Sequence, residues 1–200
     1  MNCNPFTYID MSLPDSIIDS IYETINQHNP QLNPGRVMSG GNFKEVVRIR
    51  DCKSVGLDAQ HWFVGMIWHH ISRANMHNFQ FDITSFDNDN VEFLSYDKGG
   101  HYAWHCDDFC GRYSPQVPAD GLKTEVYNEY SRKLSFSLLL NDDYEGGEFQ
   151  IYFPPHHMIT IPKEKGKLII FDSRCVHRVR KVKSGTRDVL VGWVVGPRWK

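Results

Sequence analysis

The sequence has little of what membrane-spanning and secreted proteins need. Its longest apolar runs, residues 62–68 and 189–195, are seven residues each, whereas a spanning helix needs about 20. The start, MNCNPFTYIDMSLPD, has neither a basic segment nor an apolar stretch of signal-peptide length. Five scattered cysteines, an odd number, do not suggest a disulfide framework. We therefore expect a cytoplasmic protein with reduced thiols and no membrane partner.

The sequence also lacks internal repeats and low-complexity tracts. Its 40% hydrophobic and 13% aromatic content is enough to bury a core and offset the entropy cost of ordering the chain. A chain of 200 residues is long enough for one such core but hardly for two. We expect a single domain over residues 1–200.

The net charge is only −2, but the two charge signs are unevenly distributed. Residues 163–200 contain 11 Lys and Arg against 3 Asp and Glu, net +8, whereas residues 1–162 contain 11 against 21, net −10. The basic end could attract a nucleic acid or an acidic partner. We favour solvated strand faces that oppose the protein's own acidic half, because no aromatic-rich basic stripe accompanies the charge.

Residues 1–80 are expected to be mainly helical. Ser12 and Asp15, with Pro14 between them, form a helix-start signal, and isoleucines then recur at helical spacing. A second amphipathic stretch runs over residues 57–77. Between the two, residues 46–49 are predicted to form a short strand. Both helices are interpreted as scaffold.

After residue 80 the pattern changes to short β-rich runs separated by turn residues. The predicted strands are residues 91–96, 101–106, 134–140, 148–153, 167–171, 176–182 and 188–195. Short strands after a helical third predict an α+β protein whose strands form a sandwich or barrel. The connection over residues 108–131 has no clear period, and loops of that length are often lids.

Two short motifs with metal-ligating residue types lie 72 positions apart. In HYAWHCDD, His105 and Asp107 share one face of a predicted strand, whereas Tyr102 and Trp104 alternate with it and are assigned to core packing. The later predicted strand CVHRVR carries His177. Two histidines and one carboxylate are typical of non-haem iron(II) oxygenases, whereas zinc more often takes three histidines or cysteines. These three residues are therefore the predicted metal ligands and catalytic residues, with iron favoured.

Arg187 follows His177 across a Ser-Gly turn and shares the parity of the apolar residues of its strand. Val189, Val191 and Trp193 make up that apolar set, and Trp193 is a candidate pocket wall. An arginine on an apolar face needs an anion, and its planar fork suits a carboxylate. A dicarboxylate such as 2-oxoglutarate could therefore chelate iron at one end and pair with Arg187 at the other.

The stretch from residue 96 to residue 193 resembles iron(II)/2-oxoglutarate-dependent dioxygenases, specifically the prolyl 4-hydroxylase-like branch that includes PKHD-type hydroxylases. Tyr96, Gly99 and Tyr102 precede His105-x-Asp107, and the segments RKLSFSLLLN, GGEF, GKLIIFDSRCVHRV and SGTRDVLVGW follow in the family's order. The resemblance implies a double-stranded β-helix, a jelly-roll-like barrel, with the N-terminal helices packed on one sheet. Residues 81–200 would then form the catalytic core.

The resemblance also implies a cofactor set of Fe(2+), 2-oxoglutarate as cosubstrate and O2, with ascorbate as a candidate addition. Arg187 would pair with the distal carboxylate of 2-oxoglutarate, and Tyr96 would line its pocket. Some relatives have a second tyrosine where this chain has Leu139. Ser135 and Ser137 share the parity of Leu139 and are candidates to supply a hydroxyl to the cosubstrate instead.

By the same resemblance, the expected reaction is hydroxylation of a C–H bond, of a prolyl or other amino-acid side chain in a peptide, protein or small molecule. One alternative is a non-catalytic jelly-roll domain that binds a carboxylate ligand or zinc, the latter with Cys106 and Cys110 beside His105. Another is a nucleobase-directed oxygenase of the same chemistry, which we rank lower because no base-stacking motif is present.

Overall fold

The computed structural model describes residues 4–11, 13–28, 32–39, 42–108, 130–153 and 157–199. The candidate lid was predicted over residues 108–131. Residues 109–129 of it, including Cys110, lie outside the described residues. Two α-helices lie in the N-terminal part: α1 (Asp15–His28) and α2 (Trp62–Ala74), the second continued by the π-helical turn η1 (Asn75–Phe79). None of the described helices is long and apolar enough to span a membrane.

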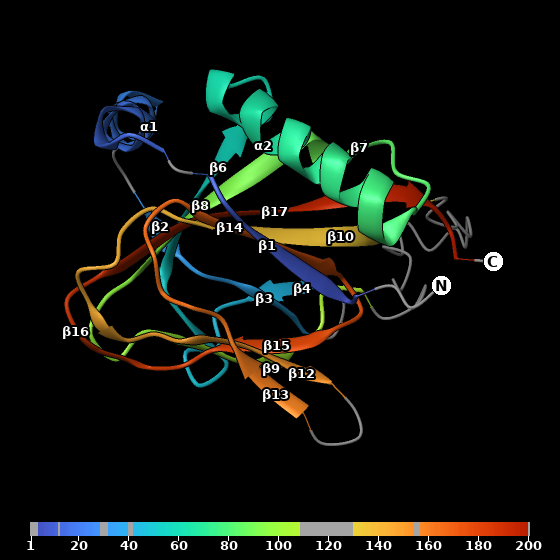
Figure 1. Ribbon diagram of the computed structural model, residues 1–200. Helices are drawn as coiled ribbons and strands as arrows, with labels where there is room; N and C mark the ends of the chain where they lie inside the picture. Colours follow the sequence, from blue (N-terminus) through green and yellow to red (C-terminus); the bar gives the residue numbers. More distant parts are fainter. Residues whose placement is uncertain are drawn as a thin grey trace, which may run out of the picture.

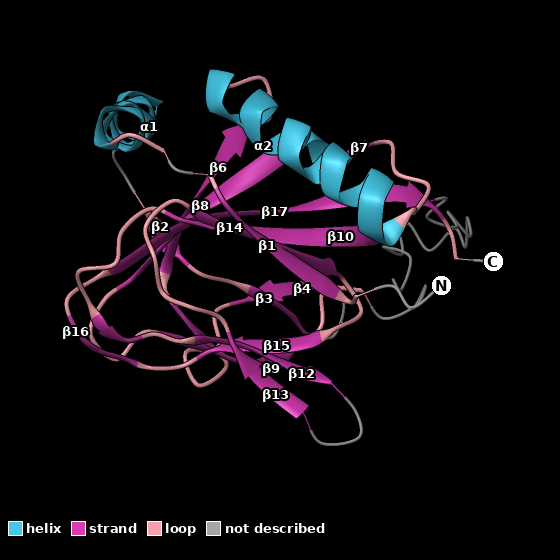
Figure 2. Ribbon diagram, in the orientation of Figure 1, coloured by secondary structure: helices cyan, strands magenta, loops and turns pink. Residues whose placement is uncertain are grey.

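The larger sheet has eight antiparallel strands and lies under both helices (Figures 1 and 2). Its order is β1 (Phe6–Asp10), β14 (Lys167–Asp172), β10 (Tyr130–Leu139), β17 (Arg187–Pro197), β8 (Asn90–Tyr96), β6 (Lys53–Asp58) and β2 (Asn33–Pro34), with β7 (Ser85–Phe86) paired to β17. The 3-10 turn η2 (Asp87–Asp89) leads into β8. The N-terminal part thus contributes strands to the sheet as well as helices.

The smaller sheet lies on the other side of the larger one, away from the helices (Figure 1). Its five strands run in the order β13 (His157–Thr160), β12 (Phe149–Phe153), β15 (Val176–Val179), β9 (His101–His105) and β5 (Arg50–Asp51). Two further pairs are β3 (Val37–Ser39) with β4 (Asn42–Lys44) and β11 (Glu145–Gly146) with β16 (Val182–Ser184). The chain therefore forms the predicted two-layered antiparallel arrangement.

The helices are held on the larger sheet by an apolar cluster. Ile18, Ile21 and Ile25 of α1 are each at most 3% exposed, as predicted from their spacing. The helical residues pack against alternate side chains of the sheet, including Phe136 and Leu190. Because successive strand residues point to opposite faces, the residues between these positions face the smaller sheet.

Two local predictions in the N-terminal part were wrong. Residues 46–49 form a turn rather than a strand, and the backbone N–H groups of Ile49 and Arg50 both donate to the carbonyl of Val46. Leu57, assigned to the second helix, lies in β6, where it is 2% exposed and paired with Val91 of β8. An apolar residue just before a helix suits either element, and only pairing with β8 decides between them.

Candidate metal centre and cosubstrate pocket

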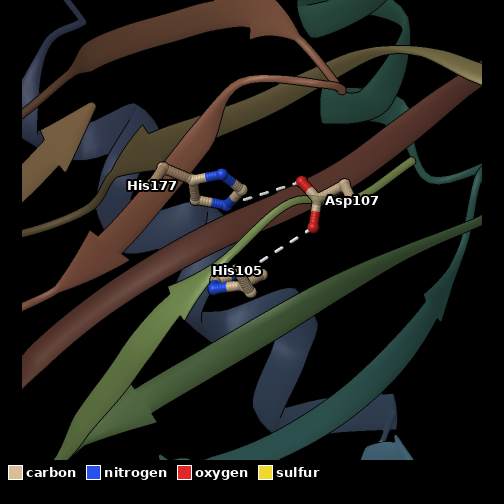
Figure 3. A group of neighbouring side chains, drawn as sticks. All are labelled: His105, Asp107 and His177. Carbon is tan, nitrogen blue, oxygen red and sulfur yellow. Dashed lines mark ion pairs between the residues drawn. The ribbon is translucent and has the colours of Figure 1, made fainter. Parts of the chain in front are cut away.

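The strand pairing of the smaller sheet brings His105 and His177 together. The two residues face each other in register across β9 and β15, and their ring centroids are 4.1 Å apart. Asp107 follows β9 directly, and its Oδ1 and Oδ2 lie 3.6 Å and 3.5 Å from Nε2 of His105 and His177 respectively. Figure 3 shows the carboxylate facing both imidazoles. One possible ligand atom from each residue lies within 4.8 Å of the others, and no other such group is found among the described residues.

Each imidazole is oriented by a backbone carbonyl two residues before it. His105 Nδ1 lies 2.8 Å from the Ala103 carbonyl oxygen, and His177 Nδ1 lies 3.0 Å from that of Cys175. A carbonyl can only accept a hydrogen bond, so Nδ1 is the protonated nitrogen and Nε2 keeps its lone pair. Both lone pairs are therefore directed to the side where Asp107 lies, as a metal site requires.

Burial keeps the His105 imidazole neutral. Desolvation and the nearby His177 lower the pKa of His105 to about 4, although Asp107 acts in the opposite direction. A neutral imidazole at neutral pH is the form that ligates a metal. His105 thus has the protonation state that a metal ligand needs.

Asp107 is a buried carboxylate held by hydrogen bonds. Burial alone would raise the pKa of Asp107, but His177, His105 and a hydrogen bond from Ser135 outweigh it and hold the pKa below its usual value. Ser135 Oγ donates to Asp107 Oδ2 at 2.7 Å and lies 2.9 Å from Ser173 Oγ. The backbone N–H of Asp107 donates to the Ser173 carbonyl at 2.9 Å. Ser135, predicted as a cosubstrate contact, thus contacts the carboxylate ligand candidate instead.

Tyr102 lies on the same face as His105, against the prediction that it alternates with that face. The two rings stack with centroids 3.6 Å apart and planes 15° apart. The reason is a register shift between β15 and β9: His177 pairs with His105, but Val179 pairs with Tyr102, so one extra residue lies on β9. Trp104 points outward and is 40% exposed. The assignment of Trp104 to core packing was therefore wrong, whereas Tyr102 does pack against the apolar cluster between the sheets.

A pocket extends from the three ligand candidates to Arg187, which begins β17. Its wall includes Tyr96, Ser137 and Trp193. Arg187 pairs with Tyr96 across β17 and β8, and its Cζ lies 5.4 Å from the centre of the Tyr96 ring. Burial, as the largest cause, raises the pKa of the Tyr96 hydroxyl, so this hydroxyl stays neutral. The three metal-ligand candidates and the guanidinium of Arg187 therefore line the same pocket.

Arg187 is buried with unused hydrogen-bond donors. It is 3% exposed, and its Nε and Nη1 have no hydrogen-bond partner among the described residues. The neighbouring Tyr144 is 4% exposed; burial raises the pKa of its hydroxyl, and Arg187 acts against that rise. A buried cation with free donors is unfavourable unless an anion pairs with it. The guanidinium therefore fits a carboxylate ligand.

Gly147 lets the backbone of its loop pack closely against the side chain of Arg187. It has a φ of +64°, and a Cβ at this position would lie 3.1 Å from Arg187 Cδ and 3.0 Å from Tyr144 Cε2. A larger residue would be strained there and would push against the anion-binding side chain. The GGEF motif is thus explained by close packing beside Arg187.

A second set of contacts ties the C-terminal segment to the loop after Asp107. Trp199 Nε1 donates to Asp108 Oδ2 at 2.7 Å. The Trp199 ring lies between Lys133 Nζ, 3.6 Å from its centre, and Arg174 Cζ, 3.9 Å from its centre. Asp108 N–H donates to the same Ser173 carbonyl as Asp107 N–H. Trp199 therefore supports the segment that carries a ligand candidate.

Sequence reasoning missed several residues around the site. Arg50 lines the pocket, is 8% exposed, and donates to the Arg36 carbonyl, Glu92 and Cys52. Its Cζ lies 5.2 Å from the centre of the Tyr102 ring that stacks on His105. Arg50, Ser173 and Trp199 lie in segments that carry no metal-ligand or strand-parity signal. Only the folded arrangement identifies them.

Comparison with known proteins decides the family. A model described as "2OG-Fe(II) oxygenase superfamily" matches residues 91–195, more than half of the chain. The chain belongs to this superfamily. The cofactor set of the family is Fe(2+), 2-oxoglutarate and O2, and the His105, Asp107 and His177 group fits iron. This confirms the resemblance inferred from the motifs.

The similar curated proteins are named PKHD-type hydroxylases. One from Synechococcus sp. is 40% identical over 80 residues, which cover 37% of this chain and 36% of that protein. One from Prochlorococcus marinus is 35% identical over 108 residues, covering 52% of this chain and 40% of that protein. The matched part thus spans well under half the length of these relatives.

The solved structures confirm the double-stranded β-helix fold. A Pseudomonas putida prolyl-4-hydroxylase superposes with a TM-score of 0.67 at 18% identity, covering 98% of this chain and 94% of that one. A Trichoplax adhaerens prolyl hydroxylase in complex with a hypoxia inducible factor peptide fragment has a TM-score of 0.71 at 20% identity, covering 96% and 83%. At these identities the likeness extends to the fold.

Proposed function

We propose that this protein is an iron(II)- and 2-oxoglutarate-dependent hydroxylase. The observation that carries the proposal is the pairing, in one pocket, of a two-histidine, one-carboxylate group with a buried guanidinium that has unused donors. When bound, iron would activate O2, so that one oxygen atom enters a C–H bond of the substrate while 2-oxoglutarate becomes succinate and CO2.

The residues of this chain have separate roles in the proposal. His105 and His177 each present Nε2 toward Asp107, which supplies the negative charge, so the group would hold a divalent cation. Ser135 and the Ser173 carbonyl fix the orientation of Asp107. Arg187 would pair with the distal carboxylate of 2-oxoglutarate, beside Tyr96 and Ser137.

The proposed substrate class is a prolyl or other amino-acid side chain, within a peptide or as a free amino acid. Support comes from the relatives, which are named PKHD-type hydroxylases, and from structural neighbours described as prolyl hydroxylases, one of them in complex with a peptide fragment. Trp193 lines the same pocket, and the Arg132 guanidinium lies 3.9 Å from the centre of its ring. A flat apolar wall of this kind suits a small aliphatic ring.

The direct test is iron-dependent release of succinate from 2-oxoglutarate by the purified protein, with a panel of proline-containing peptides screened for the mass gain of one oxygen atom. Asp107→Ala should abolish release. Asp19→Ala, an exposed carboxylate change on α1, is the matched control and should leave release unchanged. The proposal fails if the wild type, loaded with iron, is as inert as Asp107→Ala across a broad panel.

The alternative of a non-catalytic binding module makes a different prediction for metal content. Tight stoichiometric zinc without 2-oxoglutarate binding would favour the module. Iron or manganese binding together with saturable binding of 2-oxoglutarate, measured by calorimetry, would favour the hydroxylase. An Arg187→Met variant that still binds the metal but no longer binds 2-oxoglutarate would support the proposed metal site and the proposed cosubstrate site.

A further inference from the structure

The basic C-terminal part of the chain divides into two groups of cations in the structure. The first group has carboxylate partners: Lys165 pairs with Asp15, Lys167 with Glu164 at 2.5 Å, and Arg174 with Asp172 at 2.5 Å. Of these pairs, Lys165–Asp15 joins the basic end to the acidic first 162 residues, as predicted, whereas the other two lie within the basic end. They do not account for the cations of the segment RVRKVK at residues 178–183.

The second group gathers on a groove of about 420 Å³ at the outer face of the smaller sheet. Its lining includes the cationic residues Arg178, Arg180, Lys181 and Lys183 together with Trp104. None of the described residues that line the groove is acidic. The one carboxylate with a measured distance to this group is Glu148, whose Oε2 lies 3.8 Å from Arg180 Nε. The groove therefore has a strong excess of positive charge.

An aromatic ring lies at the centre of this charge. Trp104 is 40% exposed, and the Arg178 guanidinium lies with its Cζ 4.4 Å from the centre of the Trp104 ring. Arg178 Nε donates to Gln150 Oε1 at 2.8 Å, and Gln150 Nε2 donates to Thr160 at 2.9 Å. These bonds hold the guanidinium in place before any partner arrives. Exposed Trp and Arg in such a fixed pair are typical of binding surfaces.

The groove lies on the face opposite the metal centre. His105 and His177 point inward, and the neighbouring Trp104 and Arg178 belong to the alternate face of the same strands, β9 and β15. The groove shares Tyr102 and Val179 with the pocket lining but none of the three ligand candidates and not Arg187. Binding in the groove can therefore be measured apart from the proposed chemistry.

We propose that this groove binds an acidic segment of a polypeptide, rich in Asp and Glu. Four clustered cations, of which Arg180 is paired with Glu148, keep an excess of positive charge that attracts an anionic partner, and the Arg178 fork suits a carboxylate. A volume of about 420 Å³ accommodates a few amino-acid side chains. Single-stranded nucleic acids use successive exposed aromatic platforms along a groove. In the described lining of this groove Trp104 is exposed, whereas the rings of His101 and Tyr102 are partly buried. An acidic peptide is thus the better fit.

The test measures binding of a fluorescein-labelled poly-glutamate peptide to the full chain by fluorescence anisotropy. A poly-lysine peptide and an oligo-deoxythymidine serve as comparison probes. The main variant is Lys181→Glu/Lys183→Glu. The control, Arg73→Glu/Lys165→Glu, changes the net charge by the same amount at two exposed positions outside the groove. Thermal melting of each variant checks that it is folded.

The expected result is poly-glutamate binding that weakens with salt, is about tenfold weaker in Lys181→Glu/Lys183→Glu, and is nearly unchanged in the control. Trp104→Ala should weaken it to a smaller extent, about threefold, through the lost ring contact. Equal loss in both double variants would show a general charge effect and overturn the proposal. Tighter binding of oligo-deoxythymidine than of poly-glutamate, or equal binding of poly-lysine, would overturn it as well.

Discussion

The two faces of the larger sheet are built from the same strands but have opposite character. On the helix side, alternate residues such as Phe136, Leu138 and Leu190 are at most 2% exposed and pack in a cluster of apolar residues with α1 and α2. On the other side, Ser135, Ser137 and Arg187 are equally buried, at 2–4% exposed. One face stabilises the fold by apolar burial. The other carries polar groups whose burial is costly.

This difference shows that the face of the larger sheet that lies between the two sheets is less favourable for stability and is the one that carries the site. On the helix side, Asp188 is the polar exception beside the apolar cluster: it accepts from the Tyr22 hydroxyl of α1 at 3.1 Å, and its Oδ1 has no hydrogen-bond partner among the described residues. Between the sheets, Asp107 is paired and hydrogen-bonded, whereas Arg187 still lacks partners for two of its nitrogens. Buried groups without partners are rare in native proteins and call for a ligand.

Leu138→Ala should damage the fold but not the site. It removes a side chain that is 0% exposed from the helix-side cluster and is not part of the pocket lining, which should cost about 2–5 kcal/mol of unfolding free energy. Urea denaturation measures this loss. The manganese affinity of the folded fraction should stay within about twofold of wild type. A large loss of metal affinity at temperatures where the variant is folded would contradict the claim that one face of the sheet stabilises the fold while the other carries the site.

Arg187→Met should impair the site but not the fold. It removes a buried charge without a full set of partners, so the melting temperature in the absence of cosubstrate should stay equal or rise. The affinity for 2-oxoglutarate should fall by about a hundredfold, since a buried charge-assisted pair with the carboxylate is lost. Differential scanning calorimetry and isothermal titration calorimetry measure the two quantities. A marked fall in melting temperature would show that Arg187 is structural.

Ser135→Ala should weaken the metal centre without changing its ligands. The variant removes the hydrogen bond of 2.7 Å to Asp107, and loss of such a supporting contact costs about tenfold in metal affinity or more. Manganese titration followed by electron paramagnetic resonance measures it. Ser137→Ala is the matched control, because Ser137 lines the pocket near Arg187 and has no measured contact with Asp107. Equal effects on metal affinity in both variants would contradict the assignment.

Trp199→Phe should have the smallest effect. Phenylalanine keeps an aromatic ring between Lys133 and Arg174 but cannot donate to Asp108. We expect about threefold weaker metal binding and a lower melting temperature, because Asp108 is 4% exposed and its carboxylate loses a hydrogen-bond donor. Unchanged metal affinity would show that this contact does not reach Asp107.

The sequence predicted the second half of the molecule better than the first. Alternating apolar residues from β8 to β17 are repeated often enough that strand position and inward face could be inferred for Arg187 and Ser137. In the first half, residues 46–49 and Leu57 were assigned wrongly, because short apolar runs suit several elements until they pair with a partner strand. Tyr102 was placed on the wrong face because strict alternation does not anticipate the extra residue on β9.

By itself, the sequence determined the chemical types at the site and their order: His-x-Asp, a distant His, and an Arg among apolar residues of one strand. Those features depend on the alternation of residues within a strand and on their separation along the chain, and both can be obtained directly from the sequence. The folded arrangement decided that Ser135 holds Asp107, that Tyr102 stacks on His105, and that four cations line one groove with Trp104. Such contacts join strands far apart in the chain, and their register is set by pairing and by one bulge, which no local pattern records.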